Sequence, residues 1–310
     1  MFSVVIPTYN RCEILSMVLD AYLKQTHQNL IKEIIIIDDG STDDTKSVID
    51  RFFERFPPFN VIYLYQENSG PAEARNKGIQ SSSGEILLLT GDDIVPHPEM
   101  IKEHFAKHKM YNLDNNICIL GRTIWPEDMK VTPFMKHIQE MGLQFGYSII
   151  PDQNDVPFTF FYTSNISLHR DFVLGGQLFD TDFPFAAWED IEMAYRLKKR
   201  GLRIIYNSRA LGYHYHDISY ASFRGRQVKC GYAAGIFYTK HPELEEFLGI
   251  NSSKKRPLSY KFYIKLIDIF CSLSDKHSAK SYPKLYDMAM SKYYLEGIDK
   301  WKSSSKMVKE

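Results

Sequence analysis

Two adjacent carboxylates, Asp92 and Asp93, follow the strand expected at residues 85–90, at its carboxyl end. Neighbouring carboxylates repel each other, so a protein tolerates them best in water or around a cation. Mg²⁺ and Mn²⁺ take carboxylate oxygens and often keep waters or substrate phosphates as their other ligands. A solvated turn before the helix that opens at Pro98 explains the pair as well, because Asp is frequent in turns. The pair alone leaves both interpretations open.

Two other polar clusters pose a similar choice. Asp38 and Asp39 end another apolar run. A carboxylate there could accept a hydrogen bond from a nucleobase N–H or a ribose hydroxyl, or it could simply start a turn with Gly40. His214 and His216 lie two residues apart, so on a strand they would face the same side. They could ligate a metal, or they could be ordinary half-buried histidines.

Trp188, Glu189 and Asp190 open a helix expected at residues 189–200. Acidic residues in the first turn of a helix favour its dipole by roughly 0.3–1 kcal/mol, which is reason enough for them to be there. A Trp ring beside a carboxylate also suits a sugar, because the ring offers an apolar face and the carboxylate can take a proton.

The elements that position these clusters alternate over the first 110 residues. Strands are expected at residues 2–6, 33–38, 61–65 and 85–90. Helices are expected at residues 11–25, after residue 41 or 42, at 71–80 and from Pro98 onward. Continuous apolar strands alternating with helices predict an α/β fold with a mostly parallel sheet covered on both faces. Such sheets bind ligands at the carboxyl ends of their strands, which is where the polar clusters fall.

The rest of the chain predicts a second half and a tail. Residues 111–216 mix strands at 117–123, 160–168 and 203–206 with the helix at 189–200. Residues 220–248, 260–273 and 283–295 look helical. We therefore expect one catalytic domain over residues 1–216, with a nucleotide-binding half (1–110) and an acceptor half (111–216), followed by a helical extension over 217–310.

Five motifs occur in order along residues 1 to about 216. They are VVIPTYNR (4–11), IIDDGSTD (36–43), NSGPAEARNKG (68–78), the segment from Gly84-Glu85 to Asp92-Asp93, and WEDIE (188–192) with YRL (195–197). Together they resemble the family 2 glycosyltransferases, which have the Rossmann-like GT-A fold. Each motif alone is weak, but five in order at matching spacing are highly specific.

The resemblance implies a role for each cluster. The donor nucleotide sugar would be bound by residues of the first four motifs, with Asp39 on the nucleobase and Asp92 on the ribose: Pro7, Thr8, Tyr9, Asn10, Asp39, Arg75 and Asp92. The metal would be held by Asp93 and by a downstream histidine, His214 or His216. Glu189 and Asp190 would both be catalytic residues, with Asp190 as the base, and Trp188 would contact the acceptor. The family's metal motif is Asp-x-Asp, but its first position here is Gly91.

The resemblance therefore implies an inverting, metal-dependent transferase of the hexosyltransferase type. It would use Mn²⁺ or Mg²⁺ to move a sugar from a nucleotide diphosphate sugar, most simply a UDP-sugar, onto a hydroxyl of a carbohydrate or glycolipid acceptor. Synthesis of cell-surface polysaccharide or another glycoconjugate fits this chemistry. A sugar nucleotidyltransferase is the first alternative, although no glycine-rich loop follows the first strand. A catalytically inactive sugar-binding or scaffold protein of the same fold is the second.

Composition narrows the partners and the location. Thirty-eight basic residues balance thirty-eight acidic ones, which argues against nucleic acid as a partner. The four scattered cysteines need no disulfides, and we discern no signal peptide or membrane span, so we expect a cytoplasmic protein. Lysines and aromatic residues interleave at residues 254–265, so the tail could also contact the inner membrane face peripherally. Packing of the tail on its own domain is the alternative.

Overall fold

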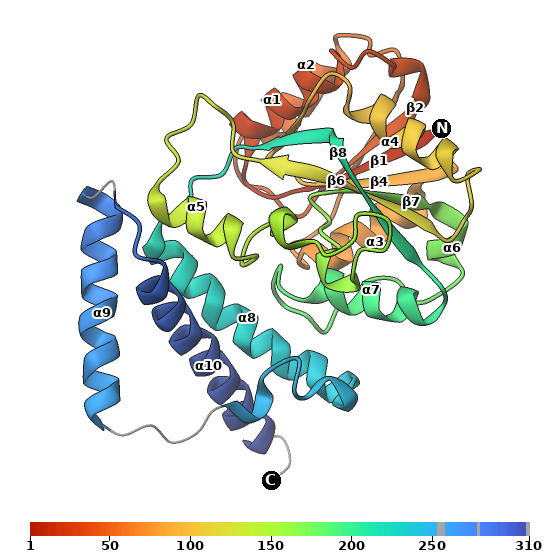
Figure 1. The fold of residues 1–310 in the computed structure, drawn as a ribbon. Coiled ribbons are helices and arrows are strands. Elements are labelled where there is room, and N and C mark those ends of the chain that lie inside the picture. Colours follow the sequence, from red (N-terminus) through yellow and green to blue (C-terminus); the bar gives the residue numbers. More distant parts are fainter. Residues whose placement is uncertain (253–257, 278–279, 308–310) are drawn as a thin grey trace. The chain divides into compact units, whose positions relative to one another are not determined.

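The computed structural model describes residues 1–252, 258–277 and 280–307 (Figure 1). The chain forms two compact units. The first comprises residues 1–129, 145–181 and 189–216, and the second comprises residues 130–144, 182–188 and 217–310. Within the described residues we find no helix whose length and hydropathy would let it cross a bilayer. The domain boundary expected after residue 216 stays a prediction.

The first unit is built on one sheet of eight strands in the order β3-β2-β1-β4-β7-β6-β8-β5. The strands are β1 (Phe2–Thr8), β2 (Ile31–Asp38), β3 (Asn60–Tyr65), β4 (Ile86–Thr90), β5 (Ile94–Pro96), β6 (Ile117–Ile124), β7 (Asn165–His169) and β8 (Arg203–His214). The first four run parallel, as the alternation of strands and helices predicted. β7 is antiparallel to both of its neighbours, β6 and β8 are parallel, and β5 is antiparallel to β8.

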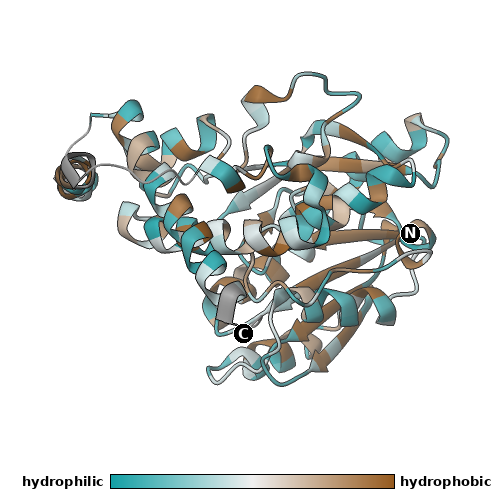
Figure 2. Cartoon of the chain, turned by 90° about the horizontal axis from the view of Figure 1, so that it is seen from below, coloured by the Kyte–Doolittle hydropathy of each residue, from teal (hydrophilic) through white to brown (hydrophobic). Residues whose placement is uncertain are grey.

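Both faces of this sheet are buried, because successive strand residues alternate between two apolar clusters. Val5, Ile37 and Leu89 belong to one cluster, and Val4 and Ile36 belong to the other. The helices of the first unit are α1 (Cys12–Tyr22), α2 (Thr45–Phe53), α3 (Pro71–Ser81), α4 (Met100–Met110), α6 (Arg170–Leu174) and α7 (Glu189–Lys199). The hydropathy colouring shows the same pattern, with hydrophobic strands and helices of mixed character (Figure 2).

Several elements differ in length from the sequence expectation. β8 continues to His214 instead of ending at residue 206, because it pairs with β6 and then with β5. The strand expected at 160–168 begins at Asn165, after a single 3-10 turn at Phe158–Phe160. The remaining short 3-10 helices are η1 (Gln28–Leu30), η2 (Tyr147–Ile149), η4 (Pro242–Leu244) and η5 (Ile250–Ser252). Pairing between distant segments, which local sequence patterns do not report, sets these ends.

The second unit is helical. Its helices are α5 (Pro133–Glu140), α8 (Tyr220–Lys240), α9 (Leu258–His277) and α10 (Pro283–Met307). α8 and α10 approach closely through glycines, since a Cβ on Gly231 would lie 1.8 Å from the Tyr294 carbonyl oxygen. The helix expected over 220–248 ends at Lys240, where His241 leaves the helical conformation just before Pro242.

Candidate active site

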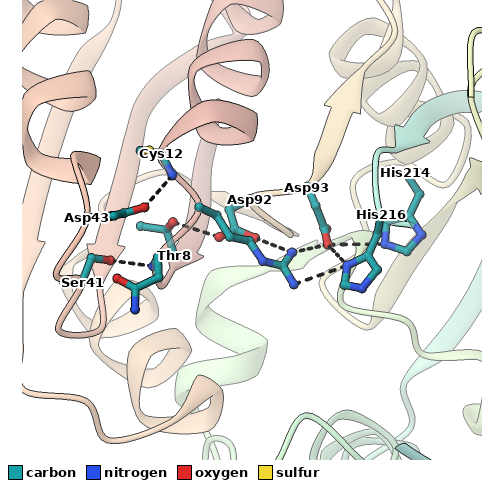
Figure 3. Close-up of polar contacts among 10 residues, drawn as sticks. Thr8, Cys12, Ser41, Asp43, Asp92, Asp93, His214 and His216 are labelled. Atoms are coloured by element: carbon teal, nitrogen blue, oxygen red, sulfur yellow. Dashed lines mark hydrogen bonds and ion pairs between the residues drawn. The ribbon is translucent and has the colours of Figure 1, made fainter. Parts of the chain in front are cut away.

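The ladder between β5 and β8 brings two histidines to Asp93. Ile94 pairs with His214 across this ladder, and the Tyr215 N–H donates to the Asp93 carbonyl oxygen (2.9 Å). His214 Nε2 lies 3.4 Å and His216 Nδ1 lies 3.2 Å from Asp93 Oδ2 (Figure 3). Both histidines that the sequence offered as alternatives therefore lie at the same carboxylate oxygen.

Arg11 links this group to Asp92. Its Nη1 donates to Asp93 Oδ2 and lies 3.2 Å from Asp92 Oδ1, while its Nη2 lies 3.3 Å from His216 Nδ1. Thr8 donates through its hydroxyl to Asp92 Oδ2 (2.8 Å). Arg11 is the last residue of the first motif, VVIPTYNR, and the sequence alone indicated no role for it. A role could have been predicted from its position, because Arg11 follows the carboxyl end of β1 and acidic residues follow the carboxyl ends of the neighbouring strands.

The two neighbouring carboxylates differ in their electrostatics. Burial and the adjacent Asp93 raise the pKa of Asp92, and Arg11 and the Thr8 hydroxyl offset only part of that rise. Burial alone would raise the pKa of Asp93 too, but His214, His216 and Arg11 hold it well below the ordinary value. Asp93 is therefore the carboxylate kept ionised by its surroundings, as a metal ligand must be.

Gly91 occupies the first position of the family's Asp-x-Asp motif. A Cβ added there would lie 2.8 Å from Asp93 Oδ1 and 3.3 Å from a side-chain carbon of Ile94. A carboxylate at position 91 would therefore need Asp93 to move. In this chain the Asp93 side chain occupies space next to the Cβ position that an aspartate at residue 91 would need.

The residues around Asp93 fit a divalent cation. One ligand atom each from Asp93, His214 and His216 lies within 4.8 Å of the other two, and Asp93 and His214 have side chains only 14% and 6% exposed. Two imidazoles and one carboxylate form a donor set that suits Mn²⁺, Fe²⁺ or Zn²⁺. Because Arg11 already contacts Asp93, a cation would have to share this carboxylate with the guanidinium or displace it.

Asp39 organises the loop that precedes α3. Its Oδ1 accepts from the Ser69 N–H (2.8 Å) and the Gln66 side-chain amide (2.7 Å), and its Oδ2 accepts from the Gly70 N–H (2.9 Å). Its own N–H donates to the Thr8 carbonyl oxygen (2.9 Å). A carboxylate offers about four acceptor sites, so three donors leave capacity for one more.

The other residues expected at the nucleotide also stand at strand ends. Pro7 and Thr8 belong to β1, and Tyr9, which follows, is 47% exposed. Asn10 adopts a positive φ of 51° and accepts from the Thr42 N–H through its side chain (2.7 Å). The Asn10 N–H in turn donates to the Ser41 hydroxyl (2.9 Å, Figure 3). These bonds tie the loops after β1 and β2 together.

Arg75 and Glu189 form a buried ion pair. Arg75 Nη1 lies 3.0 Å from Glu189 Oε1, and the two side chains are 12% and 3% exposed. Arg75 also stacks its guanidinium over the ring of Phe179, 5.6 Å from its centre. Glu189 Oε2 is buried as well. The first carboxylate of the Glu-Asp pair is thus turned toward α3 and holds its arginine.

Asp190 and Glu192 follow on the same helix. Glu192 is bound at both carboxylate oxygens by Arg196, at 2.8 Å each. Asp190 is half-buried and accepts from the Ile191 N–H (2.8 Å). It also contributes to the raised pKa of Tyr162, after the larger effect of burial. Of the three acidic residues, Glu189 and Glu192 are thus committed to arginine partners within the protein.

Trp188 belongs to the second unit. Its indole N–H donates to the Cys230 carbonyl oxygen (3.0 Å), and its ring packs edge-on against Phe237 and Phe247, with centroids 5.9 and 5.8 Å away. Its backbone has a positive φ of 69°. Trp188 therefore anchors the residues before α7, and its role toward an acceptor stays a prediction.

The chain belongs to glycosyl transferase family 2, because the model of that family matches residues 3–173. Its fold is the GT-A fold that the sequence predicted. The chain is 17% identical to a mannosyltransferase from Pyrobaculum calidifontis, solved in complex with GDP-Man and Mn²⁺, with a TM-score of 0.64 over 97% of this chain and 86% of the other. It also superimposes on S. aureus TarS 1-349 in complex with UDP, at a TM-score of 0.56 and 18% identity over 97% and 88% of the two chains.

Among curated relatives, the validoxylamine A glucosyltransferase of Streptomyces hygroscopicus subsp. jinggangensis is 27% identical over 279 residues, covering 79% of this chain. The aligned region represents 62% of that relative's length. Chondroitin synthase of Escherichia coli is 24% identical over 242 residues, which cover 68% of this chain and 34% of the relative. The chain thus spans less than two thirds of the length of these relatives.

Proposed function

We propose that this chain is an inverting glycosyltransferase that moves a hexosyl group from a nucleotide diphosphate sugar onto a hydroxyl acceptor. The observation that carries the proposal is the convergence of Asp92, Asp93, Arg11 and the two histidines where β1, β4 and β8 end. In open α/β sheets, ligands bind at the carboxyl ends of strands. Family membership supports the same reaction.

We assign the nucleobase to Asp39 and the ribose to Asp92. Asp39 retains acceptor capacity beside the loop that it organises, and a uracil N3–H would complete it, so we propose a UDP-sugar as donor. Asp92 presents a carboxylate that Thr8 and Arg11 already orient. Pro7, Tyr9 and Asn10 would line the same site, and Arg75 would lie near the diphosphate.

We assign the metal to Asp93, His214 and His216, with Mn²⁺ or Mg²⁺ as the ion. When bound, such an ion stabilises the charge that develops on the leaving diphosphate. The imidazole pair favours Mn²⁺ of the two, because Mg²⁺ prefers oxygen ligands. Arg11 is placed to contribute a second positive charge to the same diphosphate.

We assign the base to Asp190. Its carboxylate would take the proton of the acceptor hydroxyl while that oxygen forms a bond to the anomeric carbon from the face opposite the leaving diphosphate. The bond from the anomeric carbon to the phosphate oxygen breaks in the same displacement, which inverts the configuration. Glu189 then acts by holding Arg75 rather than by moving a proton.

Synthesis of cell-surface polysaccharide or of another glycoconjugate is the process that we propose for this transfer. We also propose a cytoplasmic location, because all four cysteines are free thiols, which a reducing compartment favours. Trp188 would meet the carbohydrate or glycolipid acceptor.

A screen of nucleotide diphosphates with Mn²⁺ by thermal shift tests the donor assignment, because a bound ligand raises apparent stability by mass action. Release of free UDP from UDP-sugars, measured without acceptor, then tests catalysis. Stabilisation without UDP release from any donor would instead support an inactive sugar-nucleotide-binding scaffold. A diphosphate-forming reaction between a sugar phosphate and a nucleoside triphosphate would support a nucleotidyltransferase.

A further inference from the structure

Helix α9 carries a stripe of large apolar side chains that faces solvent. The six members, each 44–64% exposed, are Phe262, Tyr263, Leu266, Ile269, Phe270 and Leu273. They recur at spacings of one and three residues, so they lie on a single face of the helix. We call them the α9 stripe. Contiguous exposed apolar surface of this kind marks a contact site on a soluble protein.

The opposite face of α9 is packed within the second unit. Ile264 and Cys271 are buried there. Asp268 accepts from the hydroxyls of Tyr220 (2.8 Å) and Tyr293 (2.6 Å), and it pairs with Arg224 (2.9 Å). The helix is therefore already docked through one face, and the α9 stripe is the face that this docking leaves exposed.

The acidic residues of α9 lie on its packed face. Its two acidic residues, Asp268 and Asp275, have partners within the second unit, and Asp275 accepts from the Tyr220 N–H (2.8 Å). Lys265 is exposed beside Leu266. Residues 254–265 contain five basic and no acidic residues, and Lys254, Lys255 and Arg256 among them lie outside the described residues. Lys265 therefore adds a positive charge beside the α9 stripe, and the other four basic residues of this stretch are known from the sequence alone.

We propose that the α9 stripe docks on the surface of an anionic lipid bilayer. Its aromatic and aliphatic side chains would enter the boundary between headgroups and acyl chains, and Lys265 would reach the lipid phosphates. Anionic lipid complements the five basic residues, with each such residue gaining from the negative surface potential. A second copy of this chain would instead bring the two basic segments together, so charge favours the bilayer over self-association.

Vesicle flotation tests this proposal with the full chain. We expect binding to vesicles of phosphatidylcholine with about 30% phosphatidylglycerol, weaker binding to phosphatidylcholine alone, and loss of the difference at high salt, since salt screens exposed charges. The triple variant F262S/L266S/L273S should lower the partition coefficient by at least about tenfold, because each replaced side chain contributes apolar burial. The matched control is F56S/M110S, which removes two side chains that are 89% and 72% exposed in the first unit and should bind as the native chain does.

Circular dichroism and the urea midpoint confirm that each variant is folded, so the outcome for the bilayer does not depend on whether the donor assignment holds. Equal binding of the native chain and the triple variant would overturn the proposal. So would native binding that is equal on both kinds of vesicle. A native dimer that the triple variant converts to monomer, with no binding to either vesicle, would show that the α9 stripe is a self-association surface.

Discussion

Arg75 on α3 and Glu189 at the start of α7 form an ion pair that is almost fully removed from solvent, with 3.0 Å between the charged groups. The two residues lie 114 positions apart in sequence. The pair connects an arginine of the third motif to the first acidic residue of the fifth. It separates the adjacent residues Glu189 and Asp190 into a positioning group and a candidate base.

Glu189→Gln should lower the free energy of unfolding by about 3–5 kcal/mol, because it leaves the buried Arg75 without its counter-charge. It should also raise the donor KM more than it lowers kcat, since Arg75 would lose its orientation. Urea unfolding and donor titrations measure the two effects. The conservative variant Glu189→Asp should recover part of both. An unchanged urea midpoint for Glu189→Gln would contradict the role given to this pair.

Asp190→Asn should reduce turnover by about 10²–10⁴-fold while donor affinity stays near normal, because only the proton acceptor is removed. Steady-state kinetics with saturating donor, with water or a sugar as acceptor, give the two parameters. Glu192→Gln serves as the control on the same helix, and we expect it to affect stability through Arg196 rather than turnover. Near-native turnover in Asp190→Asn, with Glu189→Gln inactive, would reverse the assignment.

Removal of the metal should stop the reaction. EDTA should abolish transfer and added Mn²⁺ should restore it. Asp93→Asn, His214→Asn and His216→Asn should each weaken Mn²⁺ binding by more than the roughly 10–100-fold loss typical of changes to groups that merely support metal ligands. Calorimetric titration of Mn²⁺ measures this without turnover, and His27→Asn, on the loop after α1, is the matched histidine control. Native Mn²⁺ affinity in both His214→Asn and His216→Asn would eliminate this site.

Asp39→Ala should weaken UDP binding and should also destabilise the protein, because the N–H groups of Ser69 and Gly70 lose their acceptor. A fully buried donor left without a partner costs about 1–3 kcal/mol, and because these two bonds are only part-buried, we expect a smaller loss here. Asp39→Asn, which keeps one carbonyl acceptor, should retain more stability than Asp39→Ala while still binding UDP poorly. Thermal shift with UDP and GDP separates the effects. Much greater stabilisation of the native chain by GDP than by UDP would refute the choice of base.

Acid should destabilise the first unit through His104 and His108. Both are buried residues of α4, and both contact the Ser167 hydroxyl on β7. Burial lowers the pKa of His104 to about 4 and that of His108 to about 3, and for His108 the neighbouring His104 and His169 add to the effect. Both stay neutral when folded, whereas the unfolded chain binds protons near pH 6.5. Stability is therefore complete above about pH 6.5 and falls by about 1.4 kcal/mol per pH unit for each histidine as the pH drops toward 4.

His108→Phe should make this acid loss shallower by the share of one histidine. Urea midpoints at pH 7, 6 and 5 give the slopes. The same slope in His108→Phe as in the native chain would show that other groups control the acid response.

The sequence by itself determined the parallel half of the sheet and the strand-end motifs. β1, β2 and β4 each contain an unbroken apolar run, at residues 4–7, 34–37 and 86–89. Polar residues such as Asp39 and Asp93 stand at the carboxyl ends of these strands because the strands stop there. Strand and helix periodicity is a property of neighbouring residues, so it can be derived without knowledge of the fold.

Only the tertiary structure decided which of these residues meet. The pairing of Ile94 with His214 joins segments 120 residues apart, and it places both His214 and His216 on Asp93, a choice that the sequence left open. The contacts of Arg11 with Asp92 and Asp93, and of Arg75 with Glu189, likewise depend on packing between distant elements. Strand register and side-chain packing depend on the whole core, so they cannot be derived from local sequence patterns.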